Sequence, residues 1–282
     1  MKIDIRLKII HSRNIQEVIN LDLGLNGKTA LVMASSKGLG KAIAMKFAEE
    51  GANVMLASRS EGTLKATAEE IRNKTNGNVH YTVCDITNPA SIKETVQATV
   101  EAFGPVDILV NNAGGPPAGR FDNFEDDVWQ KAFELNLLSF VRATREVLPH
   151  MRKQGGGRIL NIASSSIKEP IDGLILSNTF RNGIAGLAKS LASELGKDHI
   201  LVNTLGPGRI GTDRLAELDQ IGANKAGMTF EELRAAKAKS IPLGRLGEPE
   251  EFANIAVFLC SQANSYVTGQ ALLVDGGLIR AL

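Results

Sequence analysis

The fold is decided by residues 29–50, which read TALVMASSKGLGKAIAMKFAEE. The stretch begins with a short apolar and β-branched run, passes through a turn with two glycines, and continues with apolar residues at helical spacing. Glycines in such a turn let the backbone approach a pyrophosphate, and the N-terminus of the following helix offers free N–H groups and a partial positive charge. Two glycines alone are weak evidence, because tight turns need glycine for steric reasons.

The rest of the chain repeats this alternation of strand and helix. The predicted strands are residues 29–34, 53–57, 79–84, 107–110, 158–163, 199–205 and 271–274, and the helical patterns between them are 41–50, 64–73, 92–103, 128–153, 181–195 and 251–260. Apolar strands that alternate with helices indicate a parallel sheet covered on both faces. We therefore predict an α/β fold, a single Rossmann-type doubly wound domain with a seven-stranded parallel sheet. Its ligand should lie beyond the carboxyl ends of the strands.

Composition and charge exclude several classes of function. The 282 residues include 32 basic and 31 acidic side chains, a net charge of +1, which argues against a general electrostatic grip on nucleic acid or anionic lipid. No uncharged run is long enough to span a bilayer. Cys84 and Cys260 lie in apolar segments, as free thiols in a reducing cytosol would, so we expect a cytoplasmic protein. No metal site is predicted.

The N-terminal residues are set apart from this domain. Charges at Asp4, Arg6 and Lys8 interrupt any apolar core and exclude a secretory signal. Residues 1–22 are interpreted as a loosely held extension or as the result of a start site placed too early. The domain itself is expected over residues 23–282, because no linker or repeat divides it.

Polar and small residues follow several of the predicted strands. Asp85 follows the third strand, Asn111-Asn112-Ala113-Gly114 the fourth, and Pro207-Gly208 the sixth. All of them fall at strand carboxyl ends, where one cofactor could contact them together.

These motifs resemble those of the short-chain dehydrogenase/reductase superfamily, in particular its 3-oxoacyl-(acyl-carrier-protein) reductase branch, over about residues 24–277. Further markers are Asn136, Ser164, Asn203, residues 265–270 and residues 274–277. The resemblance implies a homotetramer or homodimer and a substrate lid over about residues 209–241. It also implies a dinucleotide site made of Ser35, Ser36, Lys37, Gly38, Leu39, Gly40, Ser58, Arg59, Asp85, Ile86, Asn112, Ala113, Gly114, Arg181, Pro207, Gly208 and Ile210.

The end of the second strand indicates which dinucleotide is used. An acid there would bind the ribose 2′-OH of NAD, but residues 56–60 read LASRS and contain Arg59 instead. Lys37 in the glycine loop adds a second cation, and together they favour NADP(H) over NAD(H). The alternative is that both are solvated surface charges.

The glycine loop departs from the family at two places. The family usually has threonine where this chain has Met33 and glycine where it has Ala34. Alanine fits a negative φ at little cost, whereas a positive φ would strain the turn and bear on cofactor affinity.

The catalytic positions depart further. The family uses a Tyr-x-x-x-Lys pair with a serine and an asparagine, and Ser164 and Asn136 match the last two. The tyrosine position holds Ser177 and the lysine position holds Arg181, so the resemblance implies an atypical member. A serine hydroxyl is a far weaker acid than a phenol, and arginine is planar, bulkier and permanently charged. The alternative is that Ser177 is a helix cap or packing residue and Arg181 a surface or interface cation.

No other side chain is predicted to supply the proton. The chain has two tyrosines and four histidines, all in segments remote from the predicted nicotinamide position: Tyr81, Tyr266, His11, His80, His150 and His199. That leaves a water ordered by Asn136, Ser164 and Ser177, or an acidic group on the substrate. We expect NADPH-dependent reduction of a carbonyl, a 3-oxoacyl thioester or another ketone, to an alcohol. The alternative is a weak or inactive NADP(H)-binding regulatory or assembly protein.

Overall fold

Seven parallel strands form one sheet in the order β3-β2-β1-β4-β5-β6-β7. The strands are β1 (Thr29–Met33), β2 (Asn53–Ser58), β3 (Val79–Val83), β4 (Ile108–Asn111), β5 (Gly157–Ile162), β6 (Ile200–Pro207) and β7 (Ala271–Val274). The structure, a computed structural model, describes residues 22–281, so the predicted N-terminal extension lies outside it except for Asp22. The predicted seven-stranded parallel sheet is confirmed.

The strand order reverses at β1. Ala30 of β1 pairs with Val54 of β2 on one side and with Ile108 of β4 on the other. The chain therefore winds outward in both directions from β1 and β4. In open α/β sheets the ligand crevice forms at this switch point, beyond the strand carboxyl ends.

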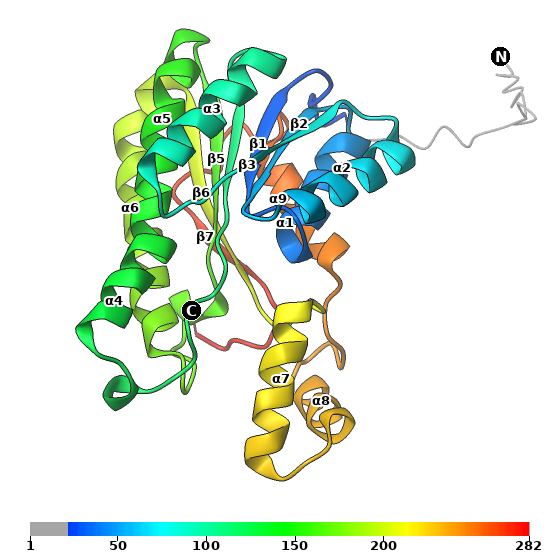
Figure 1. Cartoon of the computed structure of the whole chain (residues 1–282), viewed down its shortest axis with the longest axis vertical. Coiled ribbons are helices and arrows are strands. Elements are labelled where there is room, and N and C mark those ends of the chain that lie inside the picture. The colour runs from blue at the N-terminus through cyan, green and yellow to red at the C-terminus, as the bar shows by residue number, and fades with distance from the viewer. Residues whose placement is uncertain (1–21, 282) are drawn as a thin grey trace, which may run out of the picture.

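Helices cover both faces of the sheet (Figure 1). One face carries α1 (Gly38–Glu49), α2 (Glu61–Thr75) and α9 (Pro249–Cys260), and the other carries α3 (Pro89–Phe103), α5 (Ser139–Lys153) and α6 (Ile175–Leu195), with α4 (Asp126–Phe133) at its end. Strand β1 contributes side chains to both hydrophobic cores. Ala30 and Val32 face the first helical layer, and Leu31 and Met33 face the second. Burial on both faces explains why the strands read as continuous apolar runs.

The predicted helix at 128–153 is interrupted. Helix α4 ends at Phe133, residues Glu134–Leu138 form a π-helical turn, and α5 begins at Ser139. A π turn adds one residue to a helical register and often marks a functional site. Apolar periodicity did not show it, because the turn lasts only five residues.

Two helices project from the domain body beyond the strand carboxyl ends, at the position of the predicted lid (Figure 1). They are α7 (Asp213–Ala226) and α8 (Phe230–Lys239). Helix α8 begins at a capping box: the Thr229 hydroxyl accepts from the Glu232 N–H at 3.2 Å, and the Glu232 carboxylate accepts from the Thr229 N–H at 2.9 Å. Within residues 22–281, no helix has both the length and the apolar character needed to cross a membrane.

Candidate active site

The loop between β1 and α1 is folded so tightly that Gly40 has no room for a side chain. A Cβ there would lie 2.5 Å from the Ala34 carbonyl oxygen and 2.9 Å from the Asn112 side-chain nitrogen. Gly38 has a φ of +60°, which favours glycine. Lys37 precedes α1 and makes no side-chain cap, so no cap side chain occupies the first N–H groups of the helix. This cradle fits a dinucleotide pyrophosphate.

Ala34 has a φ of +48°, so the strained of the two alternatives holds. A left-handed conformation costs a non-glycine residue about 1–2 kcal/mol. The Asn112 side chain donates to the Ala34 carbonyl at 3.2 Å and holds the turn in place. One predicted cofactor residue thus supports the loop that carries the others.

The two loop serines differ in what their hydroxyls can do. Ser35 is fully buried, donates to the Val32 carbonyl at 2.8 Å and accepts from the Ala57 N–H at 3.0 Å. Its hydroxyl therefore joins β1 to β2, and its backbone N–H also donates to the Ala57 carbonyl at 3.1 Å, so Ser35 holds the start of the loop against β2. Ser36 and Ser58 share a hydrogen bond of 3.0 Å at the ends of the same strands and are half-buried.

Charged side chains gather beyond β2 and β3. Arg59 and Lys37 are exposed. Hydrogen bonds from the Thr87 backbone and hydroxyl lower the pKa of Asp85, and the charge of Arg59 contributes in the same direction. Arg59 and Asp85 therefore lie near each other at this edge, as the cofactor prediction requires.

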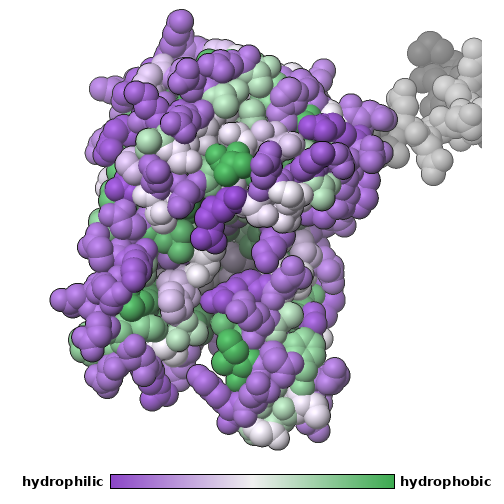
Figure 2. Space-filling view, in the orientation of Figure 1, coloured by the Kyte–Doolittle hydropathy of each residue, from purple (hydrophilic) through white to green (hydrophobic). Residues whose placement is uncertain are grey.

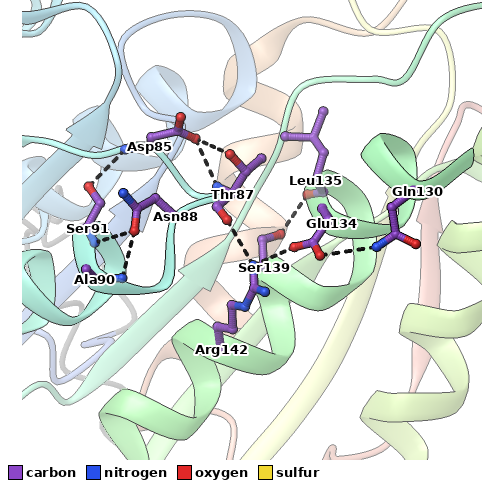
Figure 3. Close-up of polar contacts among 10 residues, drawn as sticks. All are labelled: Asp85, Thr87, Asn88, Ala90, Ser91, Gln130, Glu134, Leu135, Ser139 and Arg142. Carbon is purple, nitrogen blue, oxygen red and sulfur yellow. Dashed lines mark hydrogen bonds and ion pairs between the residues drawn. The ribbon is translucent and has the colours of Figure 1, made fainter. Parts of the chain in front are cut away.

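A polar network links Asp85 to the π-helical turn (Figure 3). Asp85 accepts from the Thr87 N–H at 2.9 Å, and the Thr87 carbonyl accepts from Arg142 at 2.9 Å. Arg142 also donates to Glu134, the first residue of the turn, at 2.6 Å. Sequence reasoning missed Glu134 and Arg142, because they are eight residues apart and match no helical pair spacing.

Asn136 lies within that turn and has no exposed surface. Its side-chain nitrogen donates to the Gly114 carbonyl at 2.8 Å, and its side-chain oxygen is buried without a hydrogen-bond partner. A buried acceptor without a donor is costly unless a water or ligand satisfies it. The arrangement fits the predicted water relay.

Ser164 and Ser177 differ in exposure and bonding. Ser164 follows β5, is half-buried, and its hydroxyl accepts from the Ser166 N–H at 3.1 Å. Ser177 is 9% exposed in the first turn of α6, whose cap residue is Leu174. The helix-cap interpretation of Ser177 is therefore wrong, and the packing interpretation stays open.

Arg181 is buried, with 5% of its surface exposed. Its guanidinium donates to the Ile162 carbonyl at 2.7 Å and to the Ala113 carbonyl at 3.3 Å. These carbonyls lie at the ends of β5 and just beyond β4, so Arg181 joins two strand ends at the predicted nicotinamide side. The surface-cation interpretation is wrong.

Arg181 also lacks an acidic partner among residues 22–281. Burial lowers its pKa to about 10, and no neighbouring carboxylate opposes that shift. The guanidinium therefore stays charged at neutral pH, compensated only by the two backbone carbonyls. An unpaired buried cation is costly and is unusual outside functional sites.

Within the described residues, the tyrosines and histidines lie away from the ends of β4 and β5. Tyr266 is 97% exposed in the loop before β7, and Tyr81 lies in the edge strand β3, three strands away from β4. His80 packs edge-to-face against Phe103, with the ring centroids 4.9 Å apart, and His150 and His199 lie near the amino ends of β5 and β6, away from the crevice. His11 lies outside the described residues.

The loop after β6 brings the lid to the crevice. Gly208 packs directly on Asp275, because an added Cβ would lie 2.4 Å from the Asp275 Cβ, and Ile210 is buried. Arg209 forms a buried ion pair with Asp219 of α7, and Arg214 of α7 donates to the Pro116 carbonyl beyond β4 at 3.3 Å. Figure 2 shows the surface hollowed between the domain body and the two lid helices.

Most of the predicted residues are brought to one edge. Asn136, Ala113, Gly114, Ser164 and Arg181 meet at the ends of β4 and β5, and the glycine loop, Ser58, Arg59 and Asp85 meet at the ends of β1 to β3. No group of three or more His, Cys, Asp or Glu residues able to hold a metal occurs within residues 22–281.

The chain is similar in sequence to known reductases. A family model described as enoyl-(acyl carrier protein) reductase matches residues 33–279. A 3-oxoacyl-(acyl-carrier-protein) reductase of Aquifex aeolicus is 36% identical over 258 residues, covering 92% of this chain and all of that protein.

Solved structures give the same result. The chain is similar to L-sorbose reductase from Gluconobacter frateurii complexed with NADPH and L-sorbose, with a TM-score of 0.88 and 34% identity over 93% of this chain and 100% of that one. It is also similar to a 7α-hydroxysteroid dehydrogenase complexed with NADH, with a TM-score of 0.82 and 35% identity over 93% and 98% of the two chains. Relatives of similar identity thus hold different nicotinamide cofactors.

Proposed function

Because this chain belongs to the short-chain dehydrogenase/reductase superfamily, we propose that it binds NADPH and reduces a carbonyl to an alcohol. When bound, the cofactor supplies the hydride. The observation that carries the proposal is the glycine loop, in which a tight cradle at Gly40 meets a helix start that no side chain caps. The NADPH-complexed relative supports the choice of NADPH, as do Arg59 and Lys37 beside Ser58.

The chain's own residues divide the remaining work. Ser164 would orient the substrate carbonyl, the free side-chain oxygen of Asn136 would hold a water, and Ser177 would pass or hold the proton. That water, or an acidic group on the substrate, would supply the proton to the carbonyl oxygen. Without a phenol, we expect the rate to fall short of a complete site by about 10²–10⁴-fold, the usual worth of general acid catalysis.

The substrate is proposed by resemblance as a 3-oxoacyl thioester or another ketone, since relatives of similar identity carry both kinds of name. The homotetrameric or homodimeric state and the cytoplasmic location stay predictions.

A second candidate function is an NADP(H)-binding regulatory or assembly protein with little turnover. It is favoured by Arg181, because the guanidinium donates its hydrogen bonds to two backbone carbonyls of the protein itself. Both functions require the same cofactor site, so they differ only in turnover.

One experiment separates the two. NADPH binding is measured by calorimetry, and NADPH absorbance is then followed with a panel of ketones and acyl thioesters. The proteins compared are the parent, Ser177→Ala and the double variant Ser177→Tyr/Arg181→Lys. Parent turnover that drops in Ser177→Ala supports the reductase. Binding without turnover, with turnover gained in the double variant, supports the regulator, and absence of NADPH binding contradicts both.

A further inference from the structure

The nicotinamide side of the site holds a buried positive charge, and no acidic residue between 22 and 281 pairs with it. We propose that Arg181 makes the protein select the oxidation state of its cofactor, binding NADPH in preference to NADP+. This inference rests on the proposed function, because it assumes that the nicotinamide lies at the ends of β4 and β5.

The first step is the charge itself. Arg181 is 5% exposed and takes part in no ion pair with any residue between 22 and 281. Burial lowers the pKa of Arg181 to about 10, so the guanidinium is still protonated at neutral pH. In a low-dielectric setting such a charge acts on its neighbours with little screening.

The second step is its position. The guanidinium is held by the carbonyls of Ile162 and Ala113, at 2.7 and 3.3 Å. The residue after Ala113 is Gly114, whose carbonyl binds Asn136. Arg181 is therefore fixed among the residues proposed to surround the reacting ring, and two carbonyls prevent it from swinging away.

The third step is the chemistry of the ring. The nicotinamide ring is neutral in NADPH and carries a positive charge in NADP+, while the rest of the two molecules is identical. A fixed cation beside the ring therefore repels only the oxidised form. Lys37 and Arg59 act on the other end of the cofactor and should attract both forms equally.

The preference has a consequence for the reaction. With the nicotinamide at the ends of β4 and β5, Arg181 would repel the positive charge that the ring carries in NADP+, so NADP+ would be bound more weakly and would leave more readily. A cation beside the ring would make the bound cofactor a weaker hydride donor, because the oxidised ring would be raised in free energy relative to the reduced one, while release of NADP+ would become easier.

The test measures binding, not turnover. Dissociation constants for NADPH, NADP+ and 2′-phospho-ADP-ribose, which lacks the ring, are determined by calorimetry for the parent, Arg181→Gln and Arg181→Lys. We expect the parent to prefer NADPH by at least about tenfold, or 1.4 kcal/mol. Arg181→Lys should keep most of that preference, Arg181→Gln should lose most of it, and the ring-less fragment should bind all three proteins alike.

Arg59→Gln is the matched control. It removes an arginine from the adenine side and should weaken NADPH and NADP+ by the same factor. Equal affinities for the two forms in the parent, or an unchanged preference in Arg181→Gln, would overturn the inference. Binding of none of the three ligands would instead contradict the proposed function.

The parent alone decides the matter if the Arg181 variants do not fold. In the parent, the neutral ring should make NADPH bind more tightly than 2′-phospho-ADP-ribose, whereas the charged ring should add nothing to NADP+. An NADP+ that gains as much from its ring as NADPH does would refute the proposed role of Arg181.

Discussion

The two halves of the crevice are built on opposite principles. At the ends of β1, β2 and β3, the cations Lys37 and Arg59 are exposed and the start of α1 has no cap side chain. At the ends of β4 and β5, Asn136 and Arg181 are buried and already bonded to backbone carbonyls. We call the first the adenine half and the second the nicotinamide half. From this difference we expect that a substitution in one half can change cofactor binding without disturbing the side chains of the other half.

The largest expected effect breaks the adenine half. Gly40→Ala places a methyl group 2.5 Å from the Ala34 carbonyl oxygen, so we expect NADPH affinity to fall by about 100-fold and stability by about 2–3 kcal/mol. Calorimetry and urea unfolding measure the two. Gly62→Ala in α2, where nothing lies within 4 Å, is the control and should leave both nearly unchanged. Normal NADPH affinity in Gly40→Ala would show that the cradle is not the binding site.

The next effect breaks the connection between the halves. Arg142→Met removes the donor that joins Glu134 to the Thr87 carbonyl, so we expect a loss of about 1–2 kcal/mol in unfolding free energy. Amide hydrogen exchange over residues 134–138 should quicken. Lys131→Met, which removes an exposed pair with Asp127, should leave the unfolding free energy almost unchanged. Equal losses in both variants would mean that the network does not hold the π-helical turn.

A smaller effect sharpens the account of the glycine loop. Ala34→Gly relieves a left-handed φ of +48°, so we expect the unfolding free energy to rise by about 1 kcal/mol. Ala57→Gly in β2 is the same substitution in a buried strand and should lower it, because a strand gains nothing from glycine's freedom. A fall in Ala34→Gly as large as that in Ala57→Gly would show that the turn stores no strain.

The smallest effect concerns pH and sets the nicotinamide half apart from surface ion pairs. Arg245 donates two hydrogen bonds to Glu251 and, with the Glu248 N–H, lowers the pKa of that carboxyl to about 2. Its folded-state pKa is depressed, so its contribution to stability is present above the ordinary value of 4.5 and is lost as pH falls toward 2. Urea unfolding from pH 6 to 2.5 should show a shallower decline for Glu251→Gln than for the parent. Parallel declines would contradict this assignment.

The sequence predicted the sheet and most of its strands because apolar strands buried on two faces leave a strong local signal. The capping box at Thr229 also leaves a local signal, because its two partners are only three residues apart in the sequence. The π-helical turn at Asn136 was not, because it changes the register over five residues and leaves composition unaltered.

Motif spacing predicts which residues belong to the candidate site, but it does not predict the contacts that their side chains make. Motif spacing placed Ser164, Ser177 and Arg181 together, but the direction of the Arg181 side chain depends on the carbonyls of two other strands. The hydrogen bonds of the Ser35 hydroxyl could not be predicted either, because its partners belong to β1 and β2. Long-range backbone contacts of this kind carry no residue signature.

The π-helical turn at Glu134–Leu138 rotates α5 about its axis relative to α4. Each residue rotates a helix by about 100°, so the extra residue sets which side of α5 faces the sheet. Phe140, Val147 and Met151 share that side and are fully packed. Deleting one residue from the turn would make α4 and α5 a continuous α-helix and would rotate these three side chains toward solvent. The π-helical turn that positions Asn136 therefore also keeps the apolar face of α5 buried against the sheet.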